Sequence, residues 1–274
     1  MVTNLPKLLI LSSLFLLFIS PALAQVDLMI MPKRIVFDGN QRSHEINLAN
    51  TGSDTATYAI SFIQYKMTED GKFEEVTEPE EGQRFATDFL RYYPRRVSLA
   101  PNEAQTVRVQ LTRTGNLEPG EYRSHVYFRA VEEQTALGLE DQEEAEGISI
   151  QIKTVFGISI PVIIRHGEST TALQIDNLRL NTENEIPQLS MALNRSGNMS
   201  VYGDLLVEHI SEAGKSTQVG IVKGISVYTP NTKRNFTFSL QVPQDTSVDL
   251  SSGKLKVSYM LENSEVAATT EMKL

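Results

Sequence analysis

Apolar and polar residues alternate with a period of two along most of the chain. The apolar positions fall in short groups: Ile46/Leu48, Tyr58/Ile60/Phe62, Val107/Val109/Leu111, Val126/Phe128, Ile148/Ile150/Ile152, Phe236/Phe238/Leu240 and Leu255/Val257/Tyr259. Alternation at this spacing places apolar side chains on one face of a β-strand. Turn-forming pairs such as Asp38-Gly39 and Ser252-Gly253 separate the groups. We therefore predict an all-β protein without amphipathic helices.

The number of strands predicts more than one domain. One immunoglobulin-like sandwich needs about 100 residues, and the chain after residue 24 is more than twice that long. We expect two tandem immunoglobulin-like β-sandwich domains. A polar break at residues 165–169 follows a long apolar strand and predicts domains at 25–165 and 166–274.

Residues 1–24 have the order of an export signal. Lys7 precedes an apolar run over residues 8–19, and the small-residue triplet Ala22-Leu23-Ala24 follows. The run is shorter than the roughly 20 residues that span a bilayer as a stable helix. We predict cleavage after Ala24, no stable membrane insertion and a periplasmic location, with an uncleaved anchor as the alternative.

Composition and charge narrow the function. The 274 residues are 41% hydrophobic and 22% charged, with a mean hydropathy of −0.20, which is typical of a globular protein. A net charge of −9 disfavours nucleic-acid binding. The absence of cysteine excludes disulfides and thiolate-ligated metals.

The sequence carries no recognisable catalytic constellation. Its four histidines are scattered among predicted strands and connections, which favours structural roles over metal ligation: His44, His125, His166 and His209. It contains no Gly-Xaa-Ser-Xaa-Gly elbow, phosphate-binding glycine loop or zinc-type helix motif. We expect a protein that is not an enzyme and needs no metal or cofactor.

Three stretches carry the remaining information. They are Met31–Gly39, with the basic pair Lys33-Arg34; Tyr93–Val109, with two strands around a proline turn; and Ile148–Thr154, with apolar residues at every second position. Before the third lies a stretch from Val131 to Gly147 with seven acidic and no basic residues. This stretch is either a solvated hairpin loop or a segment that orders on a partner.

In this order, behind an export signal and before a second β domain, these stretches resemble the periplasmic pilus-assembly chaperones of the chaperone-usher pathway, as a divergent subgroup. The resemblance implies binding of pilin or fimbrial subunits and delivery to an outer-membrane usher. It implies that Ile148, Ile150 and Ile152 fill the open groove of a subunit by strand addition. It also implies that Arg34 holds the carboxylate at the subunit's C-terminus.

The second basic anchor of the family is missing at the corresponding position. Ungapped counting from Ile148 places Gly157 there, whereas Lys153 and Lys33 are the nearby alternatives. Pro161 cannot donate to a strand ladder, so it predicts an edge, a bend or the exit toward the second domain.

Two other function classes stay open at this point. A structural surface protein or adhesin with tandem β domains would pair its strands internally and have no client. A secreted hydrolase is the third reading and has the least support. Self-association through an exposed strand is a further expectation.

Overall fold

The computed structural model describes residues 28–39, 41–131, 156–183, 185–241 and 248–274. They form eighteen strands and two single-turn 3-10 segments, η2 (Thr87–Phe89) and η3 (Thr114–Asn116). The strands are β1 (Leu28–Met31), β2 (Ile35–Phe37), β3 (Ser43–Asn50), β4 (Ala56–Ile63), β5 (Tyr65–Met67), β6 (Phe73–Glu75), β7 (Leu90–Tyr93), β8 (Arg96–Leu99), β9 (Ala104–Leu111), β10 (Gly120–Val131), β11 (Gly157–His166), β12 (Ala172–Asn181), β13 (Gln188–Ser196), β14 (Val201–Ile210), β15 (Ser216–Val227), β16 (Lys233–Ser239), β17 (Lys254–Leu261) and β18 (Val266–Lys273). The predicted all-β class is confirmed.

The first sandwich packs a four-stranded sheet, in the order β1-β3-β9-β7, against a five-stranded sheet, in the order β2-β11-β10-β4-β8. Its core is the apolar face that the alternation predicted. Ile46, Leu48, Val107 and Val109 have no exposed surface, and Phe128 of the facing sheet is equally buried. Burial of such side chains contributes about 1.5–3 kcal/mol each.

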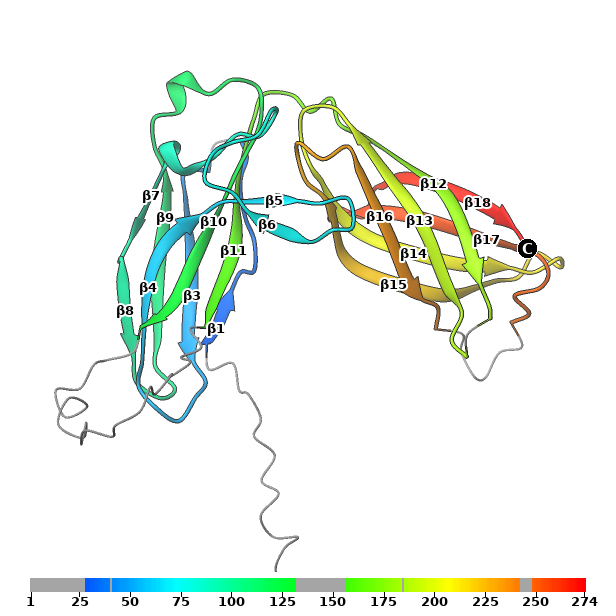
Figure 1. Cartoon of the computed structure of the whole chain (residues 1–274), viewed down its shortest axis with the longest axis horizontal. Helices are drawn as coiled ribbons and strands as arrows, with labels where there is room; N and C mark the ends of the chain where they lie inside the picture. Colours follow the sequence, from blue (N-terminus) through cyan, green and yellow to red (C-terminus); the bar gives the residue numbers. More distant parts are fainter. Residues whose placement is uncertain (1–27, 40, 132–155, 184, 242–247) are drawn as a thin grey trace, which may run out of the picture.

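The second sandwich packs a three-stranded sheet, in the order β12-β13-β16, against a four-stranded sheet, in the order β15-β14-β17-β18. Leu193 from one sheet and Val207, Val257 and Tyr259 from the other are fully buried in its core. Two tandem sandwiches are therefore present (Figure 1), as the strand count predicted.

The N-terminal segment crosses from one sheet of the first sandwich to the other. β1 pairs antiparallel with β3, whereas β2 pairs parallel with β11 in the facing sheet. Residues 32–34 make the crossing, so Arg34 comes directly before the point where Ile35 pairs with Val162. The basic pair thus lies at the sandwich edge, not within a strand.

The β5–β6 hairpin extends from the first sandwich to the second (Figure 1). At its tip the Asn235 amide donates to the Glu69 carbonyl at 2.7 Å, and the Asn231 side chain donates to the Thr68 carbonyl at 3.1 Å. Because both acceptors are backbone atoms, these contacts depend on the path of the hairpin more than on its side chains.

A buried polar network joins the sandwiches beside the hairpin. The Glu121 carboxylate is fully buried and accepts from the Ser200 amide at 3.0 Å, from the Ser200 hydroxyl and from Arg165 Nε at 3.3 Å. Arg165 also donates to the Ser200 carbonyl at 2.9 Å. Breaking such a pair would leave a buried charge without compensation, so the network fixes how the sandwiches meet.

The predicted signal segment and the acidic stretch after Val131 lie outside the described residues. Within the described ranges, no helix has the length and apolar character needed to cross a membrane.

Candidate functional site

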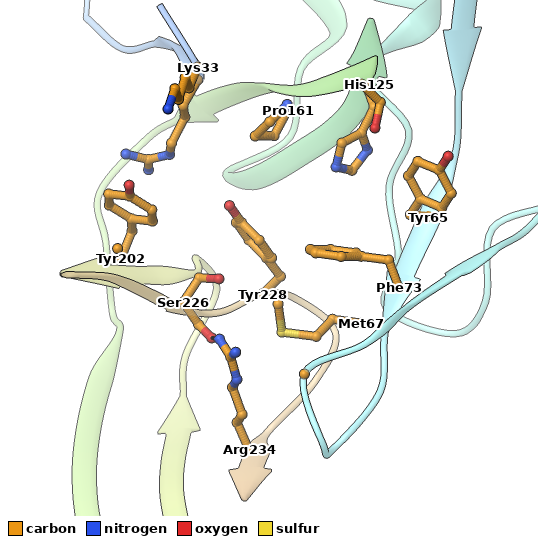
Figure 2. Close-up of a pocket in the computed structure, with 14 residues that line it drawn as sticks. Lys33, Tyr65, Met67, Phe73, His125, Pro161, Tyr202, Ser226, Tyr228 and Arg234 are labelled. Carbon is orange, nitrogen blue, oxygen red and sulfur yellow. Dashed lines mark hydrogen bonds between the residues drawn. The ribbon is translucent and has the colours of Figure 1, made fainter. Parts of the chain in front are cut away.

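A cleft of about 570 Å³ lies between the two sandwiches (Figure 2). Residues from both sandwiches form its walls, and the β5–β6 hairpin of the first sandwich contributes to them. The lining residues are Lys33, Arg34, Tyr65, Met67, Gly71, Phe73, His125, Ser159, Pro161, Tyr202, Gly224, Ser226, Tyr228 and Arg234. Its volume is in the usual range for a site that holds a small ligand or the end of a peptide.

Arg34 lines this cleft from the crossing between β1 and β2. Its side chain is only 11% exposed, and Nη1 pairs with the exposed Glu262 carboxylate at 2.9 Å. The guanidinium carbon lies 4.1 Å from the centre of the Tyr202 ring, in a cation–π contact. Nε is buried without a partner. Arg34 is therefore held in place and keeps a free donor.

Arg234 of β16 brings a second guanidinium from the other sandwich. Nη1 donates to the Ser226 carbonyl at 2.6 Å, whereas Nε is buried without a partner. Burial lowers the pKa of this group from its ordinary value. Gly71 at the hairpin tip lies directly against it, since a Cβ there would come within 2.5–2.8 Å of the guanidinium. A side chain at this position would displace the guanidinium.

The cleft is cationic on an acidic protein. Among the described residues, Lys33, Arg34 and Arg234 line it and no aspartate or glutamate does, although the chain carries a net charge of −9. Glu262 contacts Arg34 from outside the lining. Charge of this sign, with unused donors, favours an anionic ligand such as a carboxylate.

An open strand edge runs into the same cleft. Among the described strands, β2 pairs only with Val162–Ile164 of β11, which leaves the outer edge of residues 157–161 without a strand beside it. Pro161 lies at the end of this open edge, where the parallel register puts it next to Arg34. The prediction that Pro161 marks an edge is consistent with this register, and a proline there loses no ladder bond.

The structure brings only part of the sequence-predicted site together. Arg34 and the neighbouring Lys33 both line the cleft. Ile148, Ile150, Ile152 and Lys153 lie outside the described residues, so their roles stay predictions.

Gly157 does not hold a second anchor. A Cβ at this position would lie 2.2–2.4 Å from the Tyr127 ring, which covers the glycine. On β11 the residue beside Arg34 is Pro161 rather than a basic one. The second guanidinium comes instead from Arg234, about 70 residues further along the chain.

Sequence reasoning missed most of the cleft. The overlooked lining residues that matter most are Phe73, His125, Tyr202, Tyr228 and Arg234. They come from different strands of two domains, and no local motif links them. Among these residues, the sequence singles out only His125, for which it predicts a structural role.

The other histidines have ordinary surroundings. His44 donates to the Val36 carbonyl and His209 to the Ser252 carbonyl, each at 2.9 Å, and His166 is exposed. In the described part of the chain, no group of three or more metal-ligating side chains is close enough to hold an ion.

Solved structures that match this chain include chaperones and a chaperone complex. A chain from a chaperone–tip adhesin complex of CFA/I fimbriae biogenesis matches at 15% identity with a TM-score of 0.45, covering 90% of this chain and 97% of that one. The YadV chaperone (11% identity, TM-score 0.44) and the Pseudomonas aeruginosa CupB2 chaperone (14%, 0.42) each match over 90% of this chain and 100% of their own.

No protein-family model and no curated protein matches the sequence. We therefore base the functional proposal on the residues of the cleft itself.

Proposed function

We propose that the protein is a periplasmic chaperone that captures exported pilus or fimbrial subunits and delivers them to an outer-membrane usher. It holds the C-terminal carboxylate of the subunit in the cleft between the sandwiches. It pairs its own strand with the unpaired edge of the subunit at the same time.

The position of Arg34 carries this proposal. Its guanidinium lies in a cleft without acidic lining, with a buried Nε that has no partner. A guanidinium can hold a carboxylate by two parallel hydrogen bonds and stays charged when it is partly desolvated. The stacking on Tyr202 keeps the side chain oriented toward the cleft.

The open edge of β11 supports the second half of the proposal. An extended segment can add to an unpaired strand edge through backbone hydrogen bonds, and alternate side chains then enter the groove of the partner. Residues 157–161 supply such an edge directly beside Arg34. In the proposal Ile148, Ile150 and Ile152 extend the contact, each contributing roughly 1.5–3 kcal/mol before ordering costs.

Arg34→Ala is expected to abolish subunit retention while the protein stays folded. Hydrogen bonds to a charged group contribute about 1.5–3 kcal/mol, so binding should weaken at least about tenfold. The loss of stability should be about 1 kcal/mol, because the partner left behind, Glu262, is exposed. The measurement is quantitative mass spectrometry of proteins that co-purify with the tagged chain from periplasm, together with thermal melting.

The matched control is Arg96→Ala, which removes an exposed arginine of β8 outside the cleft. It should retain the same subunits as the wild type. Equal retention by the wild type and Arg34→Ala would contradict the carboxylate role. A wild-type protein that retains no subunit at all would favour the structural surface protein or adhesin.

Ile150→Thr tests strand donation separately. If this side chain enters a subunit groove, the change should reduce subunit retention strongly and shift the melting temperature little. If it belongs to the domain's own core, a hydroxyl in place of buried apolar volume should cost about 1–3 kcal/mol. Ser149→Ala and Gln151→Ala change residues of the opposite strand parity and serve as controls. A large drop in melting temperature would overturn the donor role.

A further inference from the structure

Aromatic rings gather on one side of the cleft. His125 lies 5.0 Å from Tyr65 and 5.8 Å from Phe73, and Phe73 lies 6.1 Å from Tyr228, all between ring centres. Figure 2 shows Phe73, His125 and Tyr228 around one open space, with Tyr202 across from them. These separations are typical of edge-to-face aromatic packing.

The aromatic side is open to a ligand. Phe73 is 47% exposed, although it is a large apolar side chain that packs against its aromatic neighbours. It comes from β6 of the hairpin, which the contacts at its tip fix against the second sandwich. An exposed aromatic face in a preformed cleft marks a place where a further ring can be buried.

His125 keeps this side of the cleft uncharged. Burial, and secondarily the neighbouring charge of Arg123, lower the pKa of His125 to about 3, so the ring is neutral at physiological pH. Among the lining residues, Lys33, Arg34 and Arg234 form a cationic part and the rings form an aromatic part, behind which the Arg123 guanidinium lies 4.1 Å from the centre of the Tyr228 ring.

Unused donors surround the cleft. The described residues include five buried side-chain nitrogen or oxygen atoms without a partner, and three of them belong to the lining residues Arg34, His125 and Arg234. Two of these three atoms are guanidinium nitrogens, which can only donate. Buried donors are normally satisfied, and an acceptor-rich anion is the group that would satisfy them.

We propose that the cleft selects a polypeptide whose C-terminal residue is aromatic. The carboxylate of that residue pairs with the cationic part while its ring packs among Phe73, Tyr65 and Tyr228. This inference rests on the proposed function, in which Arg34 holds a C-terminal carboxylate, and it assigns the specificity of the same site. Phe73 is the main specificity residue.

Three N-acetylated tripeptides test the selection with the mature full-length chain: acetyl-Thr-Val-Tyr, acetyl-Thr-Val-Ala and acetyl-Thr-Val-Tyr-amide. Affinities are measured by NMR titration. The free tyrosine peptide should bind about tenfold more tightly than the alanine peptide, because only the former buries a ring. The amide should bind far more weakly than either, since it lacks the carboxylate.

Two substitutions of Phe73 test whether this residue causes the preference for the tyrosine peptide. Phe73→Ala and Phe73→Leu should both reduce the ratio between the affinities for the tyrosine peptide and the alanine peptide. Tyr93→Ala is the matched control, since Tyr93 is an exposed aromatic residue (78%) outside this cleft. It should preserve the preference.

The outcomes separate this inference from the proposed function. Equal binding of the tyrosine and alanine peptides, with loss on amidation, would overturn the aromatic selection and leave carboxylate capture standing. Failure of all three peptides to bind, or equal binding of the amide, would overturn both. A tyrosine preference that survives both Phe73 substitutions would also overturn the assignment to this part of the cleft.

Discussion

The sequence predicts some side chains of the cleft and not others. Arg34 could be singled out because it precedes a strand in a motif that resembles a known family. Arg234 and Phe73 could not, because each occupies an unremarkable position in its own strand. Their role comes from the meeting of the two sandwiches, which no local pattern encodes.

The sequence did not predict the burial of His125. Strand alternation predicted apolar Val126 and Phe128 on one face, which puts His125 on the other. That face carries the β5–β6 hairpin, whose Tyr65 and Phe73 rings pack against the His125 ring, and His125 is 4% exposed. The burial that perturbs it therefore involves a hairpin that the sequence did not predict.

The perturbed histidine predicts a pH-dependent stability. The pKa of His125 is lowered from 6.5 to about 3 in the folded protein, so below pH 6.5 the unfolded chain binds a proton that the folded chain does not. The free energy of unfolding is therefore unaffected by His125 above pH 6.5, and it decreases as the pH falls from 6.5 toward 3. Between pH 7.5 and pH 5 the wild type should lose about 2 kcal/mol through this residue.

His125→Gln should remove that part of the pH dependence. Urea unfolding of both proteins at pH 7.5 and pH 5 measures it, and the wild type should show the larger decrease in the free energy of unfolding. An identical decrease in both would show that His125 titrates normally in the folded state.

Among the elements, the sequence predicted several of the long strands but neither strand of the β5–β6 hairpin. β3, β4, β9, β10 and β17 coincide with the predicted apolar alternation. β5 and β6 have three residues each, and β6 is exposed along its whole length. Met67 is the one buried side chain of the hairpin, which is too little for an alternating pattern, and backbone contacts to the other domain hold its tip.

Gly71→Ala tests the hairpin as the link between the sandwiches. Gly71 has φ of +80°, which costs other residues about 1–2 kcal/mol, and the added methyl would also displace Arg234. We expect Gly71→Ala to lose about 1–2 kcal/mol of stability. We also expect faster hydrogen exchange of the Asn235 amide, which donates to the Glu69 carbonyl in the hairpin.

Gly214→Ala is the matched control. Gly214 has nearly the same φ, +81°, but nothing within 4 Å of an added Cβ. It should cost similar stability and leave exchange at Asn235 unchanged. Equal acceleration of this amide in both variants would mean that general destabilisation, rather than loosening of the hairpin, is responsible.

At the scale of the whole molecule, composition and strand count predicted two tandem sandwiches, but nothing predicted how they join. Ile163, Met67 and Tyr228 form a small apolar cluster between them. In the sequence Ile163 reads as one more core residue of its strand. Its actual neighbours come from the hairpin and the other domain.

The shared interface limits how the protein can be taken apart or recombined. The buried Glu121 carboxylate belongs to one sandwich and its partner Ser200 to the other, and the hairpin of the first contacts the loop and strand around β16 of the second. The halves are therefore not interchangeable modules. A chimera with a foreign second domain would have to supply the side-chain donors of Ser200 and Asn231, so inheritance should conserve these two positions together rather than singly.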